Sequence, residues 1–442
     1  MVVEGWLARA AAARPERTAI DTPGRSCSYA ELLALASAGA GELAARGAGR
    51  GTRVAIELPP GLAFAQALHA CLLIGAVALP VDVRASEAER RRTAAGAALH
   101  ITEPLAERTR GPSLRSGGHD LDSTAVILQT SGTTAEPRPV ELTYGNFLWS
   151  ALGSSVALGH DPAERWLCTL PLCHVGGLSI LLRSCIHATP AIVHERFETD
   201  RVLRSLREEG VTLVSLVATT LARLLDAGLA QPPSLRCALT GGGPVPAALV
   251  DRARRAGVPV SLTYGLSEAC SQVTTTPVAA IASDGPLAAG PPLFCTRLQI
   301  APDGEILVRG PTVSPSAPAA HGWLHTGDLG SVGAYGGLRV LGRKAETIVS
   351  GGENVSPTEV EAVLEAHPQV LEAAVVGSPD EQWGEAVTAL VVAREGAELD
   401  EQQLRSHCAG ALAPFKVPKR IVAVSGPLPR TPSGKLLRRE LR

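Results

Sequence analysis

Aromatic residues are scarce in this chain, where 5 Trp, 4 Tyr and 5 Phe make up 3% of the 442 residues. Binding that depends on many aromatic stacking platforms is therefore not expected. A single Met excludes a Met-rich adaptable surface. An excess of charge is missing as well, because 41 Lys and Arg nearly balance 43 Asp and Glu, leaving a net charge of −2. That balance gives no sign of a basic nucleic-acid footprint.

A disulfide or zinc framework is also absent, since the nine Cys are odd in number, widely spaced and form no C-x-x-C pair. This pattern favours buried thiols in a reducing cytoplasm. The N-terminus carries Glu4 early and has no uninterrupted apolar run, so a secretory signal is not expected. The charge-free run 58–81 contains prolines and polar residues that interrupt a spanning helix. We interpret it as a buried helix over 62–74 and a short strand at 76–79, and expect a cytoplasmic protein without membrane insertion.

What the chain does have is 45% hydrophobic residues and a length typical of two or three domains. A helix is expected over 5–13, and Ser28 and Glu31 at capping-box spacing predict another that runs to Ala45. Further on, short apolar runs alternate with amphipathic stretches such as 199–209 and 219–228. This alternation predicts an α/β fold with largely parallel sheets and ligand sites at the loops after strands. The expected strands are 54–58, 76–83, 125–129, 165–172, 189–194, 212–218, 237–242 and 260–265.

Surface loops are expected at 108–123 and 311–320, where turn-forming residues gather. After Arg343 the pattern changes to that of a small α+β unit. It comprises a helix with Pro357 near its start, two strands (373–377 and 387–393) and a helix over 401–413. We therefore divide the chain into an N-terminal domain, 1–342, and a C-terminal domain, 343–442.

The first chemical motif is LQTSGTTAEPRP, residues 128–139, in which an apolar strand leads into a loop of small hydroxyl residues. Such a loop offers hydroxyl and backbone N–H donors to phosphate oxygens, and Arg138 adds positive charge. Walker, G-x-G-x-x-G, H-E-x-x-H and G-x-S-x-G motifs are all absent. Taken alone, the loop is more often a simple turn. Its candidate phosphate ligands are Thr130, Ser131, Gly132, Thr133 and Thr134.

The second motif combines LTGGGPVP, 239–246, with YGLSE, 264–268. Three consecutive glycines (Gly241, Gly242 and Gly243) let a planar ligand approach the backbone closely. Tyr264 is placed to cover the face of that ligand, and Glu268 is a candidate ligand for a divalent cation beside phosphates. A tight turn followed by a solvated Glu explains the same residues equally well.

Two further motifs lie in the last third of the chain. In GWLHTGDLG, 322–330, Asp328 is suited to accept hydrogen bonds from ribose hydroxyls, with Arg343 assisting; the alternative is an ordinary turn. In LPRTPSGKLLRREL, 428–441, Lys435 can bring a point charge to a phosphate; the alternative is a basic, solvated tail.

The order and spacing of these motifs, together with LPLCHVGGL at 170–178 and GRK at 342–344, resemble the adenylate-forming superfamily of acyl- and aryl-CoA ligases. The resemblance spans nearly the whole chain. It implies a large N-terminal domain of packed α/β subdomains and a small mobile α+β C-terminal domain. The segments PLCHVGGLSILLRSC, GGGPVPAALV, YGLSEACSQV and SGGENVSPTEVE are similar to the o-succinylbenzoate–CoA ligases of menaquinone synthesis.

The resemblance also implies ligands and roles. ATP, Mg²⁺ and coenzyme A would act with a small carboxylic acid, while nucleic acid is not expected as a partner and no pattern indicates an oligomeric state. Lys435, Glu268 and His174 would be catalytic, with Glu268 holding the metal. His174 and Arg183 would line the acid pocket with Gly265, and Arg183 would face a carboxylate of the succinylbenzoate. The remaining nucleotide contacts would be Arg138, Gly241, Gly242, Gly243, Tyr264, Gly265, Ser267, Asp328 and Arg343, with Ala345 at the hinge.

Several residues depart from the family pattern. The phosphate loop of the family usually reads Gly-x-Pro-Lys, but here Ala135 stands in place of the Gly, Glu136 places negative charge near the phosphates, and Arg138 keeps the charge of the Lys. Ser267 keeps the hydroxyl of the commoner Thr, and Ala345 replaces the usual Asp or Lys of the hinge. Two alternatives therefore remain. One is an adenylation enzyme that loads another acid onto CoA or a carrier protein, and the other is a non-catalytic adenylate-binding protein.

Overall fold

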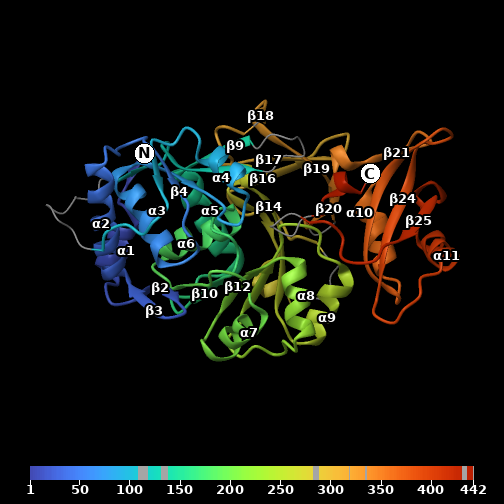
Figure 1. The fold of residues 1–442 in the computed structure, drawn as a ribbon, viewed down its shortest axis with the longest axis horizontal. Coiled ribbons are helices and arrows are strands. Elements are labelled where there is room, and N and C mark those ends of the chain that lie inside the picture. The colour runs from blue at the N-terminus through green and yellow to red at the C-terminus, as the bar shows by residue number, and fades with distance from the viewer. Residues whose placement is uncertain are drawn as a thin grey trace.

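The computed structural model describes residues 1–107, 118–130, 138–281, 288–317, 319–333, 336–430 and 436–441. Figure 1 shows an elongated molecule, with the N-terminal helices α1, α2 and α3 at one end and the sheet of β21, β24 and β25 at the other. The predicted α/β class is confirmed by the alternation of helices with strands that pair in parallel.

A five-stranded sheet is built on one side of the N-terminal region. Its inner strands pair in parallel, and β9 closes the edge as the antiparallel partner of β8. The central strands Arg53–Ile56 and Val77–Pro80 are short, largely apolar and buried, as expected for parallel strands that are covered on both faces. In sheet order they are β6 (Leu99–Ile101), β4 (Arg53–Ile56), β5 (Val77–Pro80), β8 (Thr124–Thr130) and β9 (Arg138–Thr143).

An eight-stranded sheet forms the second layer, with a parallel centre and an antiparallel pair at each edge. The expected strand at 165–172 is shorter in the structure, because the chain turns after Cys168. In sheet order the strands are β15 (Ser271–Thr275), β14 (Val260–Leu266), β13 (Cys237–Thr240), β12 (Leu213–Leu216), β10 (Trp166–Cys168), β11 (Ala191–Val193), β2 (Thr18–Thr22) and β3 (Arg25–Ser28).

Helices pack between and around these sheets. The predicted helix 62–74 is α3, which ends at Gly75 with a φ of 71°, a conformation that glycine adopts without strain. The predicted capping box is present, because Ser28 accepts from the Glu31 N–H and Glu31 accepts from the Ser28 N–H. The helices are α1 (Trp6–Ala13), α2 (Tyr29–Ala45), α3 (Leu62–Ile74), α4 (Glu87–Ala94), α5 (Tyr144–Leu158), α6 (Val175–His187), α7 (Thr199–Glu208), α8 (Ala218–Asp226) and α9 (Ala247–Arg255), with the 3-10 turns η1 (Ser267–Ala269) and η2 (Val278–Ala280).

A small antiparallel sheet follows, which the sequence analysis did not predict. Its strands carry exposed or half-exposed positions between buried ones, as in Trp323–Val332, and so lack the continuous apolar runs that marked the parallel strands. The strands are β16 (Arg297–Ile300), β17 (Glu305–Arg309), β18 (Ala319–Ala320), β19 (Trp323–Val332) and β20 (Leu338–Arg343).

The C-terminal region forms its own sheet and its own apolar core, which runs from Ile348 to Cys408. Pro357 is the first residue of a helix, as predicted, because it needs no N–H partner there. The elements are η3 (Lys344–Glu346), β21 (Ile348–Ser350), β22 (Glu353–Val355), α10 (Pro357–Glu365), β23 (Val370–Asp380), β24 (Gly384–Ala393), α11 (Glu401–Ala411), η4 (Pro414–Lys416), β25 (Arg420–Ala423) and η5 (Arg438–Glu440).

Two segments that were expected to be loops throughout contain short strands in the structure. Within 108–123, residues His119–Asp120 form β7, which pairs with β1 (Val2–Val3). Within 311–320, residues Ala319–Ala320 form β18 on the edge of the antiparallel sheet. No helix among the described residues is both long and apolar enough to cross a membrane.

Candidate active site

Two of the predicted motifs follow neighbouring parallel strands. The glycines 241–243 come directly after β13, and YGLSE forms the end of β14 and the turn η1. Since β13 and β14 pair in parallel, these segments lie at the same edge of the sheet. The carboxyl edge of a parallel sheet is where α/β proteins place their ligands.

At two positions on this edge, another part of the backbone lies so close that only glycine fits. A Cβ on Gly241 would lie 2.5 Å from the Thr263 carbonyl oxygen, and one on Gly265 would lie 1.7 Å from that of Ser271. Neither position therefore accepts a side chain without backbone movement. Gly243, in contrast, faces open space, so a ligand can approach the backbone there.

Tyr264, Asp328 and Arg343 come together although they lie far apart in the sequence. The Tyr264 hydroxyl donates a 2.7 Å hydrogen bond to Asp328 Oδ2, and Arg343 Nε lies 2.8 Å from Asp328 Oδ1. Asp328 and Arg343 are also directly paired on β19 and β20. Burial raises the pKa of the Tyr264 hydroxyl well above its usual range, so it remains a donor. This arrangement fixes the orientation of the Asp328 carboxylate.

Glu268 lies in η1, which packs against β9. Its main-chain carbonyl is held by the Ser314 N–H at 2.8 Å. In the part of the chain that the structure describes, nothing donates a hydrogen bond to its carboxylate or forms an ion pair with it. A half-buried carboxylate with free oxygens suits Mg²⁺, which prefers one or two carboxylates together with substrate phosphates.

The hydroxyl loop connects β8 to β9, and the structure describes its two ends. Thr130 and Arg138 are opposite partners in this antiparallel pair, so the two ends lie side by side. Ser131, Gly132, Thr133, Thr134, Ala135 and Glu136 lie outside the described residues, so their contacts with phosphate remain a prediction.

His174 is the residue that precedes α6 and lies beside Asp82 and Cys173, with the three ligand atoms within 4.8 Å of one another. Arg84 donates to Asp82 from Nε at 2.8 Å and from Nη2 at 2.7 Å. Burial raises the pKa of the Cys173 thiol to about 12, so it is protonated at neutral pH. Asp82, Arg84 and Cys173 were not foreseen, because only the fold brings the loop after β5 to this helix.

Arg183 lies nine residues further along α6, about 13 Å from His174 along the helix axis at 1.5 Å per residue. It is 4% exposed, and its guanidinium carbon lies 4.9 Å above the centre of the Trp166 ring. Its Nε and Nη2 have no hydrogen-bond partner among the described residues. Burial lowers its pKa to about 10, while the neighbouring Cys270 and Glu164 act in the opposite direction. Cys270 directly follows η1, which connects the surroundings of Arg183 to the YGLSE segment.

The hinge candidate, Ala345, and the candidate catalytic lysine, Lys435, belong to the C-terminal region. Ala345 is the central residue of η3, next to Lys344, whose amino group lies 2.6 Å from Asp303 and 3.1 Å from Glu305. Lys435 lies outside the described residues. The residues on either side of its loop, Arg430 and Leu436, form a β-bridge.

Comparison with known proteins gives consistent matches along the chain. Residues 7–116 and 98–316 match the AMP-binding enzyme family, and residues 359–435 match the AMP-binding enzyme C-terminal domain. A 2–succinylbenzoate–CoA ligase from Bacillus subtilis (strain 168) is 36% identical, over 99% of this chain and 97% of that protein.

Solved structures with the same fold carry informative ligands. The o-succinylbenzoate CoA synthetase from B. subtilis in complex with the acyl-adenylate intermediate OSB-AMP has a TM-score of 0.90 at 35% identity, covering 100% of this chain and 98% of that one. The same enzyme in complex with ATP and magnesium ion also has a TM-score of 0.90, at 35% identity and 100% coverage of both chains.

Proposed function

Because the chain belongs to the AMP-binding enzyme family, as its motif order indicated, we propose that it is an AMP-forming acid–CoA ligase acting on 2-succinylbenzoate. The full-length similarity to ligases of that name supports the reaction. The observation that carries the substrate is Arg183, a buried cation with two nitrogens that have no hydrogen-bond partner among the described residues.

In the first half-reaction, the substrate carboxylate attacks the α-phosphorus of ATP and expels pyrophosphate. Since both reactants are anionic, the site must supply positive charge, which we assign to Arg138, Lys435 and the donors of loop 130–134. Mg²⁺, when bound at Glu268, neutralises further phosphate charge. No side chain has to act as a covalent nucleophile, so the residues work by positioning and charge stabilisation.

Asp328 is assigned to the ribose hydroxyls. Its two oxygens accept from Tyr264 and Arg343, and a carboxylate offers about four acceptor positions in all. The two protein donors hold the carboxylate in one orientation before the nucleotide arrives. Gly241, Gly242 and Gly243 are assigned to the backbone surface for the adenine. Gly265 at the end of β14 and Ser267 in η1 are assigned to the same nucleotide site.

Arg183 is assigned to the carboxylate that is not activated. A buried charge without a partner costs several kcal/mol, so the protein alone gains nothing from holding it there. A diacid supplies the missing anion, and the guanidinium can grip it through two hydrogen bonds. His174 lies at the other end of α6 from Arg183, where we assign it to the acid pocket near the reacting carboxylate.

In the second half-reaction, the thiol of coenzyme A attacks the activated carbonyl and AMP leaves. We propose that the C-terminal domain, 343–442, turns about Ala345 relative to the N-terminal domain, 1–342, so that Lys435 withdraws and a channel for the thiol forms. Support comes from the separate apolar core that begins at Ile348. All nine cysteines are free, which fits a reducing compartment such as the cytoplasm.

The proposal is tested by ATP–pyrophosphate exchange over a panel of carboxylic acids, followed by thioester analysis. Exchange that depends on 2-succinylbenzoate, followed by its CoA thioester, is the expected result. Exchange without a CoA thioester would instead support a carrier-protein acceptor. The absence of exchange with every acid would support a non-catalytic adenylate-binding protein, the alternative that Ala135 and Glu136 raise.

A further inference from the structure

Two arginines flank the segment 431–435 that contains Lys435, one on each side. Arg430 pairs with Glu372 on β23, and Arg430 and Leu436 form a β-bridge. The Leu437 N–H also donates to the Pro429 carbonyl at 2.9 Å. On the other side Arg438 forms a larger set of contacts. The backbone bridge holds the base of the loop closed whichever arginine is replaced.

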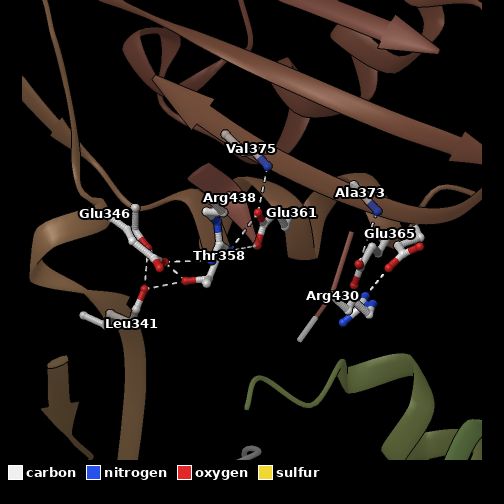
Figure 2. A network of polar contacts seen from close by, with 11 residues as sticks. Leu341, Glu346, Thr358, Glu361, Glu365, Ala373, Val375, Arg430 and Arg438 are labelled. Carbon is white, nitrogen blue, oxygen red and sulfur yellow. Dashed lines mark hydrogen bonds and ion pairs between the residues drawn. The ribbon is translucent and has the colours of Figure 1, made fainter. Parts of the chain in front are cut away.

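Arg438 connects three elements (Figure 2). Its Nη2 lies 2.9 and 2.7 Å from the two carboxylate oxygens of Glu361 on α10, and its Nη1 lies 2.7 Å from Glu346 in η3. Glu361 also accepts from the Val375 N–H of β23 at 2.7 Å. The side chain of Arg438 is 13% exposed and that of Glu361 is 10% exposed, so the group is shielded from water.

The same network reaches the junction between the two proposed domains. Glu346 directly follows the hinge candidate Ala345. On the opposite side of the hinge, the Leu341 carbonyl accepts from the hydroxyls of Ser356 and Thr358, the latter at 2.5 Å. Thr358 belongs to the first turn of α10, the helix that also carries Glu361.

We propose that Arg438 is a positioning residue for the adenylation half-reaction, which fixes the loop of Lys435 against α10 and against the residue after the hinge. The inference rests on the proposed function. Lys435 is three residues from Arg438, so the chain between them extends at most about 11 Å. When Arg438 holds Glu361 and Glu346 together, the lysine loop and the hinge turn as one body. Lys435 then reaches the phosphates in a defined position whenever the domain closes.

A role in positioning explains why three charged groups are gathered here. Burying ions costs free energy, so one cation between two carboxylates adds little net stability. The planar guanidinium does, however, fix the mutual orientation of its partners, which a lysine with a single nitrogen does not. Burial raises the pKa of Glu361, yet the pair with Arg438 favours its charged form.

The test replaces each arginine by a methionine of similar length and measures the two half-reactions separately. Arg438→Met is expected to slow ATP–pyrophosphate exchange with 2-succinylbenzoate by about 10- to 100-fold, the effect of an approximately 1 Å misplacement of a catalytic group. Thioester formation from supplied acyl-adenylate and CoA should stay within about twofold, since Lys435 does not take part in it. Arg430→Met is the matched control, because Arg430 flanks the same loop but contacts neither Glu361 nor Glu346. Its exchange rate should stay within about threefold of wild type.

Arg438→Lys tests whether the exchange reaction needs the shape of the guanidinium or only its positive charge. It also shows whether a loss of activity is caused by a folding defect. It keeps the cation, so its melting temperature should stay near that of wild type, while its exchange rate should fall nearly as far as in Arg438→Met. An equal fall in both half-reactions, full exchange in Arg438→Lys, or an equal loss in Arg430→Met would each overturn the proposal. A wild-type protein that catalyses no exchange would instead overturn the proposed function.

Discussion

The Tyr264 hydroxyl donates a 2.7 Å hydrogen bond to the carboxylate of Asp328, which lies 64 positions further along the chain. This bond joins β14 in the eight-stranded sheet to β19 in the antiparallel sheet. Arg343 holds the other oxygen of the same carboxylate. The candidate ribose site is therefore oriented by residues from two different sheets.

Tyr264→Phe should weaken ATP binding without affecting the acid. The substitution removes the hydroxyl that holds Asp328, and a hydrogen bond to a charged group contributes about 1.5–3 kcal/mol. The KM for ATP should rise about tenfold or more, while the KM for 2-succinylbenzoate should change little. Initial rates at varied ATP and at varied acid measure the two constants. An unchanged KM for ATP would contradict the role assigned to Asp328.

Gly265→Ala should destabilise the protein, because its Cβ would lie 1.7 Å from the Ser271 carbonyl oxygen. Strain from overpacking typically costs about 1–3 kcal/mol. Gly243→Ala is the control, since its Cβ would meet no atom within 4 Å. Chemical denaturation of both variants gives the comparison. Equal stabilities would show that β14 and β15 are not held at this distance.

Arg183→Met should impair the use of 2-succinylbenzoate without a matching loss of stability. Removing a buried cation whose Nε and Nη2 have no hydrogen-bond partner in the described part of the chain should leave the free energy of unfolding unchanged or raise it. The lost contact with Trp166 would subtract about 0.5–2 kcal/mol. Losing the partner of a buried carboxylate costs about 2–5 kcal/mol, so kcat/KM for 2-succinylbenzoate should fall at least about 30-fold. Acids with a single carboxylate should be used as before. A variant that handles the diacid normally would refute the assignment.

Glu365→Gln should remove a pH dependence of stability. Burial raises the pKa of the Glu365 carboxyl to about 7 from its usual 4.5. Between pH 4.5 and 7 the folded protein therefore keeps a proton on Glu365 that the unfolded chain releases. The free energy of unfolding accordingly falls as the pH rises through this window, because deprotonation favours the unfolded chain. Above pH 7 the loss of stability stays constant. At pH 8 the variant should be more stable than wild type by up to about 3 kcal/mol, and at pH 4 by little. Urea denaturation at both pH values measures the difference. The same difference in stability between variant and wild type at pH 4 and at pH 8 would contradict the raised pKa of Glu365.

Much of the parallel core could be predicted from the sequence because its signals are local. Helix 62–74 follows from an apolar run bounded by glycines, and the helix after Ser28 follows from its capping box. The antiparallel sheet from β16 to β20 could not be found this way, because its half-exposed strands are polar on alternate positions. Its pairing depends on partners distant in the sequence.

The candidate site likewise contains some residues that could be predicted from the sequence and others that could not. Tyr264, Glu268, Asp328 and Arg343 stand in recognisable motifs, so spacing was sufficient to select them. Asp82 and Arg84 beside His174 and Trp166 beneath Arg183 carry no motif and become neighbours only through the fold. Arg438 entered the sequence analysis only through the alternative of a basic, solvated tail, since the carboxylates that pair with it lie 77 and 92 positions earlier.

The most direct test of the account is the product formed from ATP, coenzyme A and 2-succinylbenzoate, compared with acids that lack either one of its two carboxylates. Mass spectrometry should detect AMP and the CoA thioester of 2-succinylbenzoate, with kcat/KM for the diacid at least about 30-fold above either single-carboxylate acid. Equal use of a single-carboxylate acid, or no thioester from the diacid, would contradict the account.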